Sequence, residues 1–175
     1  MSAVTATVHV ARIEDDASVR AVRGLRVAQD QYRFVGDITF NLGDSLRDPM
    51  SEAMAVWADG AVIGFYRLDF APNAVAGRAF ERPSVGLRAF VIDQSQQGRG
   101  YGTQAMAACC ADLRRRHPDR ALLVLTVNCS NLAALAAYRK AGFVDTDELY
   151  RGGSAGPQHL MLHHLQPQAP PDPER

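Results

Sequence analysis

A glycine-rich turn in the second half of the chain constrains the fold more than any other feature. Residues 84–92 read as a strand, and after a short polar stretch the turn Gln97-Gly98-Arg99-Gly100-Tyr101-Gly102 follows. A helix is predicted from there to Pro118, because the apolar residues from Met106 to Leu113 have the i, i+3, i+4, i+7 spacing of one helix face. The pattern predicts a strand–turn–helix unit.

Three glycines within five positions make this turn a candidate anion site. Glycine permits tight bending and leaves backbone N–H groups unobstructed, and a helix N-terminus behind them favours a pyrophosphate. Tight turns also use glycine for steric reasons alone, so the turn by itself is weak evidence. A P-loop would need a lysine where Thr103 follows Gly102, and a dinucleotide fingerprint would need a glycine at Thr103. Both nucleotide interpretations fail.

The remaining segments predict a mixed sheet. Strands are expected at 7–12, at 53–58 and 61–70 (a hairpin turned by Asp59-Gly60), at 121–127, 143–150 and 159–165. Helices are expected from the acidic run at 14–16 to about 29, at 45–50 and at 131–140, with loops at 31–41 and 72–83. This order is typical of an α/β (α+β) fold with helices on the faces of a sheet. We expect one domain over 1–165 and a disordered, proline-rich tail over 166–175.

The predicted helix at 131–140 carries two polar residues that suit a ligand. Asn131 and Tyr138 are seven residues apart, so they share one helix face. An amide can bind a peptide-like ligand, and a phenol with an ordinary pKa near 10 is a proton donor at neutral pH. The alternative is that Asn131 is only an N-cap and Tyr138 only a half-buried aromatic.

Together these segments resemble the GNAT superfamily of N-acetyltransferases. The turn is similar to the family pattern Gln/Arg-x-x-Gly-x-Gly/Ala at Gln97, Gly100 and Gly102. Residues 131–143 are similar to Asn-x-x-Ala-x-x-x-Tyr-x-Lys-x-Gly-Phe. The resemblance covers residues 84–143, and the first half matches only in the order of its elements. It implies a GNAT-type, mostly antiparallel central sheet with helices on both faces.

The resemblance implies acetyl-CoA as co-substrate and no metal. The expected CoA-binding residues are Phe90, Val91, Ile92, Gln97, Gly98, Arg99, Gly100, Tyr101, Gly102, Thr103 and Asn131. The strand at 90–92 would pair with the pantetheine arm, and an amine would attack the thioester directly. The amide of Phe90 would stabilise the oxyanion, and Tyr138 would protonate the CoA sulfur.

Only a weaker resemblance indicates which amine accepts the acetyl group. Residues 31–35, Gln-Tyr-Arg-Phe-Val, resemble the diamine and polyamine acetyltransferase branch, and a polycation would suit nearby carboxylates. Five acids lie in that region, namely Asp30, Asp37, Asp44, Asp48 and Glu52. Other small amines, antibiotics and a protein N-terminus stay open as acceptors. Candidate general bases are Glu52, Asp69 and Glu81, with a water chain as the alternative, and none is assigned.

Composition excludes several other classes of function. The chain has 19 basic and 19 acidic residues, so it lacks the basic footprint of a nucleic-acid binder. Three cysteines, no apolar leader and no apolar run of ~20 residues predict a cytoplasmic protein without a membrane segment. The expected partner is a small-molecule amine, and a homodimer stays open. The competing interpretation is a CoA-binding regulatory module without turnover.

Overall fold

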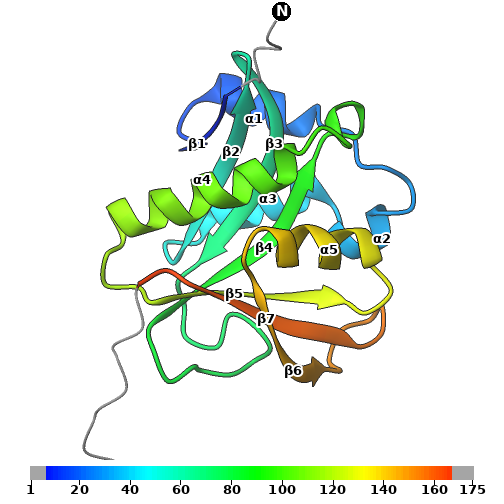
Figure 1. Cartoon of the computed structure of the whole chain (residues 1–175). Helices are drawn as coiled ribbons and strands as arrows, with labels where there is room; N and C mark the ends of the chain where they lie inside the picture. The colour runs from blue at the N-terminus through cyan, green and yellow to red at the C-terminus, as the bar shows by residue number, and fades with distance from the viewer. Residues whose placement is uncertain (1–6, 167–175) are drawn as a thin grey trace, which may run out of the picture.

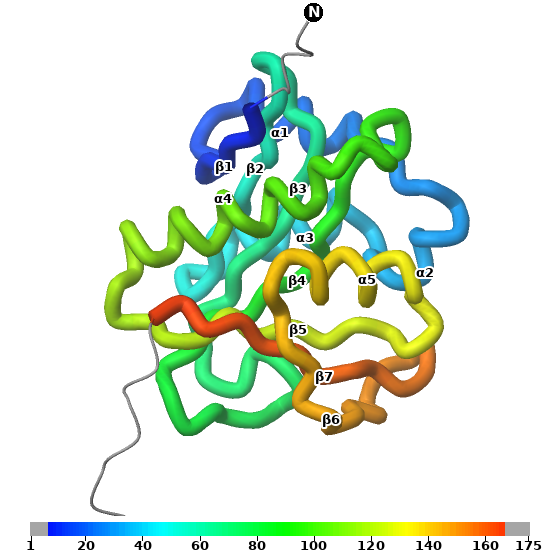
Figure 2. Tube along the Cα trace, in the orientation of Figure 1, coloured from blue at the N-terminus to red at the C-terminus, as the bar shows by residue number. Residues whose placement is uncertain are grey.

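A computed structural model describes residues 7–166 of the chain, and Figures 1 and 2 show the path of the backbone. In chain order the elements are β1 (Val8–Arg12), α1 (Asp16–Arg23), α2 (Tyr32–Val35), α3 (Ile38–Arg47), β2 (Ser51–Ala58), β3 (Ala61–Asp69), β4 (Ser84–Ile92), a short 3-10 helix (Gln94–Gln96), α4 (Tyr101–Arg116), β5 (Leu122–Asn128), α5 (Leu132–Lys140), β6 (Val144–Tyr150) and β7 (Gln158–His164). The tail expected after 165 lies outside the described residues, apart from Gln166.

The strands form one mixed sheet of seven strands in the order β1-β2-β3-β4-β5-β7-β6. Every neighbouring pair is antiparallel except β4 and β5, which are parallel. The predicted fold class, a mostly antiparallel sheet with helices on both faces, is therefore confirmed. The hairpin of β2 and β3 turns at Asp59-Gly60, where both residues have a positive φ.

Three apolar clusters pack against the sheet, and the two largest lie on opposite faces. On one face, Val22 of α1 and Leu42 of α3 pack against Phe65 of β3. On the other face, α4 and α5 cover a larger core that includes Met106 and Leu125 (Figure 1). Burial of apolar side chains is the dominant favourable contribution to folding, so these two layers hold the sheet between them.

The prediction for residues 24–50 was wrong in three places. The first helix ends at Arg23 rather than near residue 29, with Gly24 as its C-cap. The expected loop at 31–41 instead holds α2 and the start of α3. Asp37 begins α3, because its side chain accepts a hydrogen bond from the amide of Phe40 at 2.9 Å. The short helix predicted for 45–50 is the end of α3, which stops at Arg47.

A β-bulge in β4 exchanges the two faces of that strand. Arg88 lies opposite Arg67, and Val91 lies opposite Phe65, so Ala89 and Phe90 together face the single residue between those two partners. Ala89 has a φ of 54°, which is uncommon for a residue other than glycine. Because side chains alternate along a strand, the extra residue places Arg88 and Phe90 on opposite faces of the sheet.

The only parallel pair in the described sheet is short. β4 and β5 pair at three positions, from Ser84 with Leu122 to Gly86 with Val124. Beyond Gly86 the two strands diverge, although both continue for several residues. The split leaves peptide groups of two inner strands without sheet partners on the sides that face each other.

Gly64 in β3 packs closely against the end of β4 that diverges from β5, and replacing it tests this packing. A Cβ at this position would lie 2.6 Å from the carbonyl oxygen of Val91 and 2.9 Å from Cδ1 of Ile92. We expect Gly64→Ala to lower the free energy of unfolding by about 1–3 kcal/mol, as overpacking does. In Gly43→Ala, the matched control in α3, the new methyl group meets only the flexible end of Arg47. The control should be neutral or stabilised by up to about 1 kcal/mol. Urea titration measures both, and equal midpoints for Gly64→Ala and the wild type would contradict the packing argument.

Candidate active site

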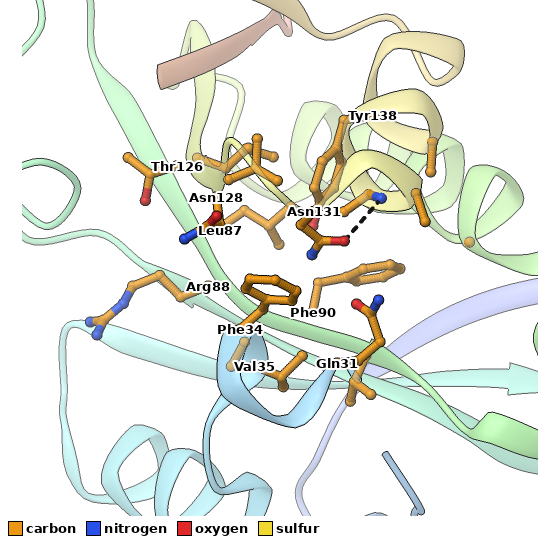
Figure 3. A pocket seen from close by; sticks show the side chains of 18 of the residues that line it. Gln31, Phe34, Val35, Leu87, Arg88, Phe90, Thr126, Asn128, Asn131 and Tyr138 are labelled. Atoms are coloured by element: carbon orange, nitrogen blue, oxygen red, sulfur yellow. Dashed lines mark hydrogen bonds between the residues drawn. The ribbon is translucent and has the colours of Figure 1, made fainter. Parts of the chain in front are cut away.

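A cavity of about 820 Å³ opens where β4 and β5 diverge. It reaches from the α2 segment on one side to α5 on the other, and Figure 3 shows it from close by. The lining comes from seven main segments, which are residues 31–35, 74–77, 87–92, 96–103, 125–128, 131–138 and 153–158. Segments far apart in the sequence thus meet at one break in the sheet.

The glycine-rich turn forms one end of the cavity. Gly98 and Gly100 have φ values of 76° and 79°, which glycine adopts without strain. Gly100 precedes α4, and it provides no side-chain cap for the helix. The first amides of α4 therefore have no partner within the helix, as at any uncapped helix N-terminus. Gln97 donates from Nε2 to the carbonyl oxygen of Ile92 at 3.0 Å and so fastens the turn to the end of β4.

Asn131 lies at the opposite wall of the cavity and is the N-cap of α5. Its Oδ1 accepts a hydrogen bond from the amide of Ala134 at 3.4 Å, which makes it the N-cap of α5. Its Nδ2 makes no hydrogen bond to the described residues, although the side chain is buried and lines the cavity. Figure 3 shows this amide group beside the space above Phe34 and Phe90. A single asparagine thus caps the helix and retains a donor for a ligand.

Tyr138 projects from α5 into the same cavity (Figure 3). Its ring contacts the ring of Phe90, with centroids 6.3 Å apart, and that of Phe143, with centroids 5.4 Å apart. Burial raises the pKa of the Tyr138 phenol above its ordinary value, and the nearby Cys109 acts in the same direction. The phenol is therefore a protonated donor at neutral pH, and its position is set by aromatic packing rather than by a hydrogen bond among the described residues.

The cavity brings together almost all of the residues predicted from the sequence. Its lining includes Phe90, Val91, Ile92, Gln97, Gly98, Gly100, Tyr101, Gly102, Thr103, Asn131 and Tyr138. Arg99 is the exception, since it does not line the cavity. Arg88 and Thr126 also line it and were missed. Arg88 could have been found as the one charged residue in the strand at 84–92, whereas nothing in the sequence distinguishes Thr126.

None of the three candidate bases lines the cavity. Glu52 lies 2.8 Å from Nη2 of Arg116 and 3.2 Å from Nε2 of His117. Asp69 is buried and accepts hydrogen bonds from two arginines. Glu81 is exposed in the loop before β4.

The five acids predicted to attract a polycation do not line the cavity either. Asp37 caps α3, Asp44 pairs with Arg67 at 2.8 Å, and Asp48 accepts from the amide of Met50. Over residues 7–166, the lining contains no Asp, Glu, Lys or His, and its charged residues are Arg33 and Arg88. The cavity therefore has a positive rather than a negative wall.

Two features are absent from the described part of the chain. Within residues 7–166, no three His, Cys, Asp or Glu side chains gather as ligands of a metal ion would. No helix of this part has the length and apolar character required to cross a bilayer.

Comparison with known sequences gives the family. The model of the acetyltransferase (GNAT) family matches residues 16–143. A mycothiol acetyltransferase from Saccharomonospora viridis is 33% identical over 135 residues, which cover 76% of this chain and 39% of that protein. The chain thus spans about two fifths of the length of this curated relative. The N-acetyltransferase YbbJ of Bacillus subtilis is 28% identical over 112 residues, or 64% of this chain and 69% of that protein.

Solved structures share the fold at lower identity. The aminoglycoside acetyltransferase AAC(6')-Ib in complex with paromomycin and acetyl-CoA has a TM-score of 0.70 and 19% identity, covering 90% of this chain and 93% of that one. A spermidine N-acetyltransferase from Vibrio cholerae in complex with CoA and spermine has a TM-score of 0.65 and 14% identity, covering 91% and 96%. These likenesses concern the fold, and the family match spans most of the sequence. The chain belongs to the GNAT family of acetyltransferases.

Proposed function

We propose that this protein transfers the acetyl group of acetyl-CoA to a primary amine of a small molecule. The observation that carries this proposal is the convergence of three parts on one cavity. These parts are the uncapped N-terminus of α4 behind its glycine turn, the unpaired inner edge of β4, and the protonated phenol of Tyr138. Family membership supports the same reaction class.

Two parts of acetyl-CoA, the pyrophosphate and the pantetheine arm, would find matching surfaces in this cavity. The pyrophosphate would accept hydrogen bonds from the amides of the turn and from the first turn of α4, where the helix dipole favours negative charge. The pantetheine arm carries amide groups that would pair with the free edge of β4 at 90–92, as an added strand does. The Nδ2 of Asn131 would donate to the same arm from the opposite wall.

The chemistry follows from this placement. The neutral amine attacks the thioester carbonyl carbon, and the amide of Phe90, at the bulge, donates to the oxygen that becomes negative. When the tetrahedral intermediate collapses, the C–S bond breaks and Tyr138 gives its proton to the sulfur. The additional proton on the amine leaves through water and restores the phenol. The products are the N-acetylated amine and CoA, and holding both substrates in line provides most of the acceleration.

A diamine or polyamine acceptor stays a prediction. It is supported by the sequence resemblance at 31–35 and by a fold shared with an enzyme whose structure contains spermine. The positions of the acids argue against it, because none of them lines the cavity. We therefore propose a primary amine as the acceptor class.

Removing the Tyr138 hydroxyl tests the general-acid role. Tyr138→Phe keeps the ring contacts and deletes the proton donor, so we expect kcat to fall by ~10²–10⁴-fold with little change in acetyl-CoA affinity. Release of CoA and the melting temperature are measured on the same variant. A kcat close to that of the wild type, at an unchanged melting temperature, would show that Tyr138 only packs.

A charge at the turn tests the placement of the pyrophosphate. Gly100→Asp puts a carboxylate beside the first amides of α4, and we expect CoA affinity to fall by at least ~10-fold in calorimetry. Gly60→Asp is the matched control, because Gly60 also has a positive φ (74° against 79° for Gly100) and a Cβ added there would also meet no atom within 4 Å. The control should bind CoA as the wild type does. Equal CoA affinities for the two variants would exclude the turn as the pyrophosphate site.

The pH dependence tests the absence of an enzymic base. Since burial raises the pKa of Tyr138 above its ordinary 10.0, the phenol stays protonated up to about pH 10. No acid or histidine among the described residues lines the cavity, so the amine's own ionisation controls the rate. We expect kcat/KM to rise roughly tenfold per pH unit and to level off near the pKa of the amine. Two amines of different pKa should shift the midpoint accordingly, and a midpoint independent of the amine would reveal an enzymic base.

A further inference from the structure

The two arginines of the cavity wall differ in how they are held. Arg33 is exposed on α2, where its guanidinium lies over the ring of Phe34, 4.5 Å from the centroid. Within the described chain it has no carboxylate partner. Arg88 instead donates from Nη1 to Oδ2 of Asp69 at 3.1 Å. Asp69 is itself only 4% exposed, so the group that orients Arg88 belongs to the core.

A chain of ion pairs fixes Arg88 in place. Arg67, 2% exposed, donates to Oδ1 of Asp69 through Nε at 3.2 Å and Nη2 at 2.9 Å. Its Nη1 reaches Asp44 at 2.8 Å. Arg67 thus orients Asp69, and Asp69 in turn accepts a hydrogen bond from Arg88. A guanidinium has five N–H donors, and only one donor of Arg88 is used in this chain, while half of its side chain stays exposed.

Arg88 lies on the side of the cavity away from the proposed CoA site. Arg88 precedes the bulge in β4. The glycine-rich turn, where we place the pyrophosphate, comes after the opposite end of the same strand. The bulge sends Arg88 to the face opposite Phe90 and Tyr138. Figure 3 shows its guanidinium at the end where Thr126 lies, with Phe34 between it and Phe90. An anion held by Arg88 would therefore belong to the acceptor rather than to CoA.

We infer that the acceptor amine carries a carboxylate and that Arg88 binds this carboxylate. The inference rests on the proposed acetyl transfer and names the substrate class of the same site. A guanidinium forms paired hydrogen bonds with a carboxylate, and Asp69 occupies only one of the N–H donors of Arg88. Thr126 adds a hydroxyl at the same end of the cavity.

The charge of the wall decides between an anionic and a cationic acceptor. A second ammonium group beside Arg88 would be repelled by its guanidinium, because the Asp69 carboxylate that pairs with Arg88 is buried and does not line the cavity. A carboxylate at the same place would be attracted. No acid lines the described cavity to reverse this preference. The acceptor is accordingly an amino acid, an ω-amino acid or a short peptide rather than a polyamine.

A series of matched amines tests the inference with the wild-type protein. The acids are β-alanine, γ-aminobutyrate, δ-aminovalerate, ε-aminocaproate and glycylglycine, and each is compared with its own amide. Cadaverine is the cationic counterpart of δ-aminovalerate. We expect at least one acid to exceed its amide by about 10–100-fold in kcat/KM, as a hydrogen bond to a charged group would give, and cadaverine to be the poorer member of its pair.

Substitutions assign this preference to one side chain. Arg88→Gln should reduce the ratio of acid to amide to about one, chiefly through KM, because the lost contact is made equally in the ground and transition states. Arg88→Lys should keep part of the acid-to-amide ratio, since lysine keeps the positive charge but cannot form the paired hydrogen bonds of a guanidinium. Arg33→Gln removes the other charge of the wall and should change the ratio by less than about threefold. CoA affinity, measured by calorimetry, should stay as in the wild type in all three variants.

The outcomes separate the two proposals. If the wild type binds no CoA, the proposed function is wrong. If it binds CoA and acetylates amides or cadaverine as well as or better than every acid, or acetylates no acid, the inference is wrong. Loss of CoA affinity in Arg88→Gln would assign Arg88 to the cofactor, and equal loss of preference in Arg33→Gln would assign the preference to the general charge of the wall. Either result would overturn the role of Arg88.

Discussion

The site depends on the point at which β4 and β5 stop pairing. Their ladder ends at Gly86 and Val124, although both strands continue. Inside a sheet, an unpaired peptide group that water cannot reach is costly, so the gap needs either solvent or a ligand with amide groups of its own. The cavity lies in this gap between β4 and β5. The pantetheine arm of acetyl-CoA has amide groups that would complete the interrupted ladder in the binding mode that we propose.

The bulge at Ala89 and Phe90 gives the two sides of this gap different characters. Before it, β4 directs Arg88 toward the face of α3; after it, Phe90 turns to the face of α5 and packs against Tyr138. One additional residue thus separates an ionic end of the cavity from an aromatic end. We assign the first to the acceptor and the second to the departing thiol.

The placement of the acids shows why their clustering in the sequence was a poor guide to the lining of the cavity. Asp37 is used as a helix cap, Asp44 as a partner of the buried Arg67, and Glu52 as a partner of Arg116. Each satisfies a donor that the fold buries or leaves unpaired at a helix end. Their clustering in the sequence reflects helix starts and a buried guanidinium. The charged residues that line the cavity are Arg33 and Arg88.

Several parts of the molecule could be predicted from residue order alone, because their signals are local. The glycine turn, the strand before it, the helices α4 and α5 and the hairpin of β2 and β3 follow from periodicity and turn chemistry, which act over a few residues. The face that each residue of β4 presents could not be predicted, because the bulge depends on how β4 pairs with β3. The ion pair that positions Arg88 could not be predicted either, because Asp69 and Arg88 meet only when those two strands pair. Long-range pairing, which no local pattern encodes, therefore set the character of the proposed acceptor site.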